Sequence, residues 1–312
     1  METQKTQLKG ILILLLTAII WGTSFVSQSV GMESVEAFTF NGIRTLIGSF
    51  VLLPFIVMRD KISERKMTKE QIAERKKNDL KTIRRGIILG VVLCAATNFQ
   101  QFAFLYSTAG KIAFITAMYM IFVPIAEVII GRKIPFITWL CVAAGFAGLF
   151  LLCMNPENMT RINKGDFLTL ICAAIFTIQI MLVSRFSPKC DGLKLSFTQF
   201  FTSGIISFIL MLIFETPSVK GILAAALPIL YSGVMSCALA YTFQIIGQKY
   251  CEATIASLLM CMESVFAVIS AAIILGEKMS GRELAGCAIM FAAIIISQLG
   301  EKILERPQKK AA

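Results

Sequence analysis

The stretch NFQQFAFLYSTAG at residues 98–110 recurs in altered form as TFQIIGQKYCEAT at residues 242–254. The shift of 144 positions matches Phe99-Gln100, Tyr106, Ala109, Met118 and Phe122 with Phe243-Gln244, Tyr250, Ala253, Met262 and Phe266. Earlier in each half the offset is 155, and it pairs Trp21 with Phe176, Ser24 with Gln179 and Arg44 with Gln199. The two offsets predict that the chain is a tandem duplication of one large unit. A soluble repeat protein would instead show many shorter periods.

The composition predicts that this unit lies in a membrane. Hydrophobic residues make up 56% of the chain, and the mean hydropathy is +0.77. A run of about 17 to 25 mainly apolar residues crosses about 30 Å of hydrocarbon as a helix. Such runs occur near residues 8–27, 35–58, 86–105, 112–130, 136–154, 167–184, 195–214, 222–247, 253–275 and 284–304.

These runs divide into five spans per copy, and an odd number makes the second copy cross the membrane in the opposite direction. We therefore predict an all-α integral membrane protein with ten transmembrane helices arranged as two inverted-topology five-helix repeats. Many secondary transporters use this arrangement to alternate access to a site at the membrane midplane. The first repeat is expected over residues 1–158, the second over 159–304, and a tail over 305–312.

The positive charge of the chain follows this topology. With both ends on the cytoplasmic side, 23 Lys and Arg residues lie inside, six lie outside, and Arg44 lies within a span. Cytoplasmic loops are enriched in basic residues, so the N- and C-termini are predicted to lie on the cytoplasmic side. The protein is expected in the cytoplasmic (inner) membrane. Residues 59–85, with eleven basic residues, are expected to be a solvated cytoplasmic loop that could form a short amphipathic helix, with a lipid or regulatory contact as the alternative. A nucleic-acid partner is not expected.

Several classes of site are disfavoured by what the sequence lacks. It has no histidine, and its nine cysteines are scattered with no Cys-x-x-Cys pair, so neither a metal site nor a cofactor is expected. No Walker-type loop is present to drive an ATP-powered pump. Carboxylates within the spans are sparse, which disfavours an intramembrane enzyme.

Polar side chains inside the apolar spans fall on single helical faces. Because polar groups are costly in hydrocarbon, such stripes indicate a shared wet interior, although any one of them could equally join two helices. The candidates for a cavity are Trp21, Ser24, Arg44, Asn98, Gln101, Thr116, Tyr119, Phe176, Gln179, Tyr241 and Gln244. The fifth and tenth spans, rich in Ala and Gly, are expected to pack at the periphery.

Three ionisable residues and two prolines stand out within the spans. Glu263 is a candidate for binding or coupling, since an unpaired carboxylate at that depth could carry a proton. Arg44 could bind an anion or pair with Glu263, whereas Glu127 is expected to have a structural role near Arg132. Pro124 and Pro228 are hinge candidates, with a tolerated kink as the alternative, because proline removes a helical hydrogen bond.

The ordered motifs of both halves resemble the EamA-like transporters of the drug/metabolite transporter superfamily. They are Ile20-Trp21-Gly22-Thr23-Ser24-Phe25, Arg44, Phe114-Ile115-Thr116-Ala117 with Val123-Pro124, Gly165-Asp166-Phe167-Leu168, Met262-Glu263-Ser264-Val265-Phe266-Ala267 and Leu275-Gly276-Glu277-Lys278. The chain departs from the family pattern at Ser264, where Pro is usual, and at Phe176, where Trp is common.

The resemblance implies a ten-helix carrier with both termini inside, of a kind mostly known for exporting amino acids, other metabolites or toxic compounds. We expect a secondary transporter of small organic solutes, with amino acid export first and proton coupling through Glu263 as an addition. Efflux of organic cations or drugs and uptake of a nutrient are the alternatives, and a membrane protein that does not transport is a remote one. The sequence leaves the oligomeric state open.

Overall fold

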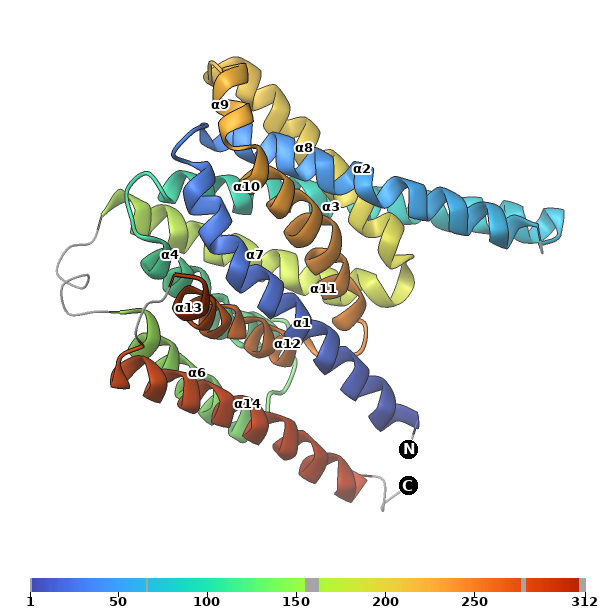
Figure 1. Ribbon diagram of the computed structural model, residues 1–312. Helices are drawn as coiled ribbons and strands as arrows, with labels where there is room; N and C mark the ends of the chain where they lie inside the picture. Colours follow the sequence, from blue (N-terminus) through green and yellow to red (C-terminus); the bar gives the residue numbers. More distant parts are fainter. Residues whose placement is uncertain (1, 66, 155–162, 276–278, 309–312) are drawn as a thin grey trace.

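The computed structural model describes residues 2–65, 67–154, 163–275 and 279–308, and its elements there are helical (Figure 1). The first half contains α1 (Glu2–Gly31), α2 (Ala37–Glu64), α3 (Lys69–Ala103), α4 (Ala109–Thr116), α5 (Tyr119–Ile129) and α6 (Phe136–Cys153). The second half contains α7 (Lys164–Phe186), the short η2 (Ser187–Lys189), α8 (Gly192–Phe214), α9 (Val219–Ala224), α10 (Ala226–Tyr231), η3 (Ser232–Ala240), α11 (Tyr241–Gly247), α12 (Ala253–Met260), α13 (Met262–Leu275) and α14 (Gly281–Gln308).

The predicted membrane fold is confirmed. In the described part of the chain, nine helical stretches are long and apolar enough to cross a membrane, and α14 covers the tenth predicted span. The expected boundary between the repeats, at residues 158 and 159, and the motif residues 276–278 lie outside the described residues. So do the last four residues of the expected tail.

The helices form a bundle whose two halves interleave. α2 and α3 of the first half pack against α8 of the second, and α1 packs against α13. α6 and α14 pack against each other along one edge, at the bottom of Figure 1. α1 begins and α14 ends on the same side of the bundle, which is called the terminal face below; the other side is called the opposite face.

Glycines bring α6 and α14 into backbone contact at this edge. A Cβ atom added at Gly148 would lie 2.8 Å from the carbonyl oxygen of Gly286, and one added at Gly286 would lie 2.6 Å from the carbonyl oxygen of Gly148. Small residues at membrane helix interfaces permit such close approach. The Ala- and Gly-rich composition of these two helices thus serves their mutual packing.

Gly148→Ala is expected to lower the thermal midpoint of the purified protein in detergent, because the new methyl group meets backbone that cannot move aside. Overpacking of this kind costs about 1 to 3 kcal/mol. Gly145→Ala, on the same helix, is the matched control: its methyl group meets the flexible end of Met120 instead. Equal midpoints for the two variants would contradict the close contact.

The fourth span of each half is broken at repeat-related positions. α4 ends at Thr116 and α5 begins at Tyr119, while α12 ends at Met260 and α13 begins at Met262. Tight i to i−3 hydrogen bonds mark both breaks, from Met120 N to Ala117 O (3.0 Å) and from Ser264 N to Cys261 O (3.2 Å). Since α12 and α13 contain no proline, the break does not depend on Pro124, which lies one turn further along inside α5.

The eighth span is irregular in a different way. Pro228 lies in the first turn of α10, where a missing N–H is tolerated, so the helix begins near it rather than bending at it. Beyond α10, the nine residues of η3 form a π-helix, a rare conformation that is frequent at functional sites. The hydroxyl of Ser27 on α1 donates to the carbonyl of Pro228 (2.9 Å), which ties the two spans together.

The charged segment 59–85 is largely helical. α2 continues to Glu64, and α3 already begins at Lys69 behind a capping box of Thr68 and Gln71, so most of the segment is a helical hairpin. At its base Lys194 of α8 pairs with Asp60 (2.7 Å) and Asp79 (2.6 Å). The hairpin is therefore fixed to the second half of the chain by charge.

Candidate functional site

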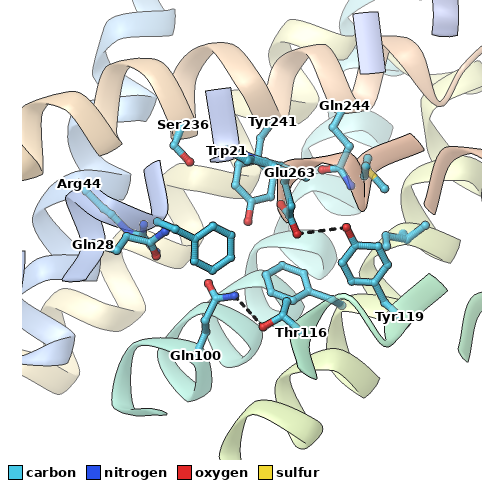
Figure 2. Close-up of a pocket in the computed structure, with 14 residues that line it drawn as sticks. Trp21, Gln28, Arg44, Gln100, Thr116, Tyr119, Ser236, Tyr241, Gln244 and Glu263 are labelled. Carbon is cyan, nitrogen blue, oxygen red and sulfur yellow. Dashed lines mark hydrogen bonds between the residues drawn. The ribbon is translucent and has the colours of Figure 1, made fainter. Parts of the chain in front are cut away.

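A cavity lies in the middle of the bundle, at the level of the two helix breaks (Figure 2). Its free volume for water-sized molecules is about 40 Å³. This is well below the range of about 300 to 1,000 Å³ typical of small-molecule sites, so a substrate needs the walls to move apart. Its walls are Trp21, Phe25, Gln28, Arg44, Gln100, Thr116, Tyr119, Phe176, Ile180, Ser236, Tyr241, Gln244, Met260 and Glu263.

Most of this lining obeys the internal repeat. The offsets of 155 and 144 relate five pairs within it: Trp21 and Phe176, Phe25 and Ile180, Gln100 and Gln244, Thr116 and Met260, and Tyr119 and Glu263. The cavity thus lies on the axis that relates the two halves. The four remaining residues, Gln28, Arg44, Ser236 and Tyr241, make it asymmetric.

The two broken spans meet at this axis. The hydroxyl of Tyr119, in the first turn of α5, donates to Glu263 Oε1 in the first turn of α13 (3.3 Å). Cys261 Sγ lies 3.5 Å from the carbonyl oxygen of Ala117, another repeat-related pair. The N-terminal end of a helix carries partial positive charge, which partly offsets the cost of burying a carboxyl group at this position.

Gly22 lets α1 approach Glu263 closely. A Cβ atom at Gly22 would lie 2.6 Å from the carbonyl oxygen of Glu263 and 2.8 Å from the backbone nitrogen of Ala267. Trp21 beside it is placed against Tyr241, with ring centroids 4.6 Å apart and an edge-on arrangement. The local motif Trp-Gly therefore builds both an aromatic wall and the contact between α1 and α13.

Arg44 is held by amides rather than by a carboxylate. It is only 3% exposed, and its Nε donates to Asn41 Oδ1 (2.8 Å). Asn41 in turn donates to Asn98 Oδ1 (2.9 Å), and Asn98 donates to Ser207 Oγ (2.9 Å). This relay fixes the side chain from α3 and α8. Among the described residues, no carboxylate oxygen lies within 4 Å of the Arg44 guanidinium.

Glu263 is also buried, at 4% exposure, and forms no ion pair with a described residue. Arg44 and Glu263 line one cavity from different sides, with Trp21 and Tyr241 between them (Figure 2). Two further polar atoms on its walls, Trp21 Nε1 and Gln28 Oε1, have no hydrogen-bond partner in the described part. The cavity thus offers a guanidinium group, a carboxyl group, an unpaired donor and an unpaired acceptor between aromatic faces.

Eight of the candidates proposed from the sequence reach this cavity, namely Trp21, Arg44, Thr116, Tyr119, Phe176, Tyr241, Gln244 and Glu263. Four others do not line it. Ser24 and Gln101 are fully buried beside it, Gln179 is hydrogen-bonded to Gln244 (3.1 Å), and Asn98 opens instead onto an apolar cleft between α3 and α8.

Six lining residues were not among the candidates, namely Phe25, Gln28, Gln100, Ile180, Ser236 and Met260. The repeat offsets would have identified Gln100 from Gln244 and Met260 from Thr116. Gln28 lies one turn beyond Ser24 and belongs to the polar face of α1 that the sequence already indicates with Trp21 and Ser24. Nothing in the sequence points to Ser236, which enters the cavity from the π-helix.

Glu127 lies outside the cavity. Its carboxylate pairs with Arg132 (2.8 Å) and accepts from the Thr254 hydroxyl (2.5 Å), which joins α5 to α12. Within the described residues, no three His, Cys, Asp or Glu side chains are grouped to hold a metal ion.

Comparison with known proteins places both halves in one family. The model of the EamA-like transporter family matches residues 8–154 and again residues 163–299. An uncharacterized transporter of Archaeoglobus fulgidus is 25% identical over 289 residues, covering 92% of this chain and 84% of the relative. One of Clostridium kluyveri is 26% identical over 304 residues, covering 94% of each.

The uncharacterized inner membrane transporter YedA of Escherichia coli K12 is 22% identical over 290 residues, covering 91% of this chain and 88% of YedA. A solved crystal structure superimposes with a TM-score of 0.76 over 95% of this chain and 98% of the other, at 17% identity, which shows a shared fold.

Proposed function

Because the chain belongs to the EamA-like transporter family, we propose that it moves small zwitterionic metabolites, amino acids first, out of the cell by alternating access. It is a multi-pass membrane transporter and not an enzyme. The substrate and the direction of transport are the proposed part. The observation that carries the substrate class is the presence of Arg44 and Glu263, unpaired with each other, on different sides of one cavity.

A zwitterion satisfies both groups at once. Its carboxylate would accept hydrogen bonds from the fork of the Arg44 guanidinium, which suits planar acceptors. Its ammonium group would lie against Glu263, and a side chain of modest size would rest on the faces of Trp21, Phe176 and Tyr241. Unpaired buried charges are costly, so a ligand that neutralises both gains affinity from the arrangement.

Efflux of organic cations is the second candidate. Glu263 and the aromatic walls favour a cation, because aromatic faces attract cations, whereas Arg44 opposes one. We expect cationic dyes to compete weakly with a zwitterion. Uptake of a nutrient remains open, since the fold does not set the direction of transport.

The terminal face is proposed to be cytoplasmic. The helical hairpin between α2 and α3 and both chain ends lie on that face and carry most of the basic residues, as cytoplasmic segments do. The name of the Escherichia coli relative, an inner membrane transporter, supports the inner membrane as the location.

The proposal is tested by comparing extracellular metabolites of cells that produce the wild-type chain with those of cells that produce Glu263→Gln at equal membrane abundance. Glu252→Gln, the same change at an exposed residue outside the cavity, is the matched control. A zwitterion that accumulates outside with wild type and the control alone supports export through this cavity. Identical metabolite profiles for all three chains would reject metabolite export.

Asn41→Ala is expected to raise the half-saturation concentration for the substrate about two- to tenfold, because Arg44 loses the acceptor that orients it. A hydrogen bond of this kind contributes about 0.5 to 1.5 kcal/mol. Ser49→Ala is the matched control, since its hydroxyl is equally buried on α2 but bonds only locally, to Leu46 O. Saturation curves in proteoliposomes measure both. An unchanged half-saturation concentration for Asn41→Ala would show that the relay does not position Arg44 for binding.

A further inference from the structure

Three fully buried glutamines form a hydrogen-bonded cluster between α7, α8 and α11. Gln179 Nε2 lies 3.4 Å from both Gln199 Oε1 and Gln244 Oε1, and Gln244 Nε2 donates back to Gln179 Oε1 at 3.1 Å. None of the three is more than 1% exposed. Gln244 also lines the cavity, so the cluster lies directly against it, on the side where α11 approaches the terminal face.

The repeat relates each of these glutamines to a residue of the first half. The offset of 155 connects Gln179 with Ser24 and Gln199 with Arg44, and the offset of 144 connects Gln244 with Gln100. Because the repeats are inverted, Ser24, Arg44 and Gln100 occupy the equivalent level on the side of the opposite face.

The two sets differ in their hydrogen bonds. The three glutamines bind one another, whereas Arg44 donates to Asn41, Gln100 donates to Thr116 (3.1 Å), and Ser24 Oγ has no partner among the described residues. The three glutamines thus join α7, α8 and α11 to one another, whereas Ser24, Arg44 and Gln100 form no hydrogen bonds with one another among the described residues.

The shape of the cavity agrees with this difference. Gln28 and Arg44 line it, but their repeat-related residues, Val183 and Gln199, do not. The cavity therefore extends further toward the opposite face than toward the terminal face, and the glutamine cluster lies where the missing extension would be.

We propose that Gln179, Gln199 and Gln244 are the gate that closes the cavity toward the terminal face, and that Ser24, Arg44 and Gln100 are its counterpart on the other side. This proposal rests on the alternating-access function proposed above. When the repeats exchange conformations, the glutamines separate and the counterpart set closes.

The chemistry of the cluster suits a gate that must open. Amide hydrogen bonds between membrane helices are individually weak, so separating three glutamines costs less than separating an ion pair. Gln199 Nε2 is buried without a partner in the described part, which leaves the closed arrangement incompletely satisfied. Water entering from the terminal face would hydrate all three amides at once.

The test uses a reporter cysteine at Ser236, which lines the cavity beyond the gate, in a chain from which the nine native cysteines have been removed. A membrane-impermeant thiol reagent is applied to each side of sealed vesicles of known orientation. Lys77→Cys, an exposed position on the hairpin between α2 and α3, identifies which side is the terminal face.

Gln179→Leu is expected to increase the rate of labelling from the terminal face at least about tenfold and to slow labelling from the opposite face. Gln101→Leu, the same change at a fully buried glutamine of α3 outside both sets, should leave both rates unchanged. Gln199→Asn, which keeps the amide but shortens its reach, gives the same readout if Gln179→Leu does not fold.

An unchanged rate from the terminal face, in a variant that still reacts from the opposite face, would overturn the gate. Labelling needs no substrate, so this outcome is separate from a failure of the proposed function. If the rates change as expected but no zwitterion is transported, the gate stands and the substrate class is wrong.

Discussion

Arg44→Gln will lower the transport of a zwitterionic amino acid about 30-fold or more at subsaturating concentration. Arg44 is 3% exposed and has no carboxylate partner in the described part of the chain, so its terminal nitrogens are available to the substrate. Removing one partner of a buried, hydrogen-bonded charge pair costs about 2 to 5 kcal/mol. At 1.4 kcal/mol for each factor of ten, that is about 30-fold to over 1,000-fold.

Two further variants, Arg132→Gln as the control and Arg44→Lys as the conservative change, show whether the loss of transport is due to Arg44 itself. Arg132→Gln removes a guanidinium that pairs with Glu127 outside the cavity and is expected to keep most of the activity. Arg44→Lys keeps the charge but loses the planar fork, so its rate should fall between those of wild type and Arg44→Gln. Initial rates in proteoliposomes at equal protein content measure all three. Activity of Arg44→Gln within twofold of wild type would remove Arg44 from the binding site.

Comparing an amino acid with the matching amine tests whether Arg44 contacts the carboxylate directly. Wild type should prefer an amino acid to the matching amine that lacks the carboxylate, whereas Arg44→Gln should bind the two nearly equally. If Arg44 only joined helices, the variant would weaken both ligands by the same factor, because the preference depends on a direct contact with the carboxylate.

Glu263→Gln will abolish accumulation driven by a pH gradient and lower the affinity for a zwitterion about tenfold or more. The variant keeps the shape of the side chain and removes the charge that an ammonium group or a proton would meet. A hydrogen bond to a charged group contributes about 1.5 to 3 kcal/mol, which sets the size of the loss in affinity. Accumulation with and without a gradient, and counterflow without one, are the measurements.

The two roles of Glu263 separate in this experiment. If counterflow persists with a higher half-saturation concentration while gradient-driven accumulation is lost, Glu263 both binds the substrate and couples transport to protons. Tyr119→Phe is the milder comparison, because it removes only the hydroxyl 3.3 Å from Glu263 Oε1 and should change affinity no more than about threefold. Gradient-driven accumulation by Glu263→Gln equal to that of wild type would exclude Glu263 as the proton carrier.

The fold could be predicted from the sequence because the hydropathy pattern and the repeat offsets are visible along the whole chain. Long apolar runs must cross the membrane as helices, and an odd number of them per repeat fixes the inversion. Arg44 and Glu263 could be selected for the same physical reason: a charge in hydrocarbon is costly, so it is retained where it has a use.

The helix breaks could not be predicted. Neither Ala117 nor Cys261 is a residue that ends helices, and the one nearby proline lies on the wrong side of the first break. The local sequence therefore carries no signal for either break. In the sequence Gly22 is identified only as part of a motif. The structure explains its small size, because a side chain there would clash with the backbone of Glu263.

The sequence indicates that residues 59–85 could include a short amphipathic helix, but hydropathy does not show how far the helices α2 and α3 extend into this segment. Lys, Arg, Glu and Gln are good helix formers, so polarity ends the membrane span without ending the helix. Gln179 is a cavity candidate because the repeat relates it to Ser24. The sequence alone does not distinguish an amide on a wall from an amide bonded to the residue behind that wall.

Tyr119 and Glu263 are related by the repeat and lie in contact, so the distance between them is expected to be the same in both conformations of the transporter. Residues related by the repeat axis exchange places when the halves exchange conformations, so the separation of such a pair is the same before and after. Spin labels at Ala117 and Cys261, which meet on that axis, would therefore report the same distance in the two end states of the cycle. A pair that the repeat does not relate would report a distance that changes, and the distance between Ala117 and Cys261 would serve as the internal reference.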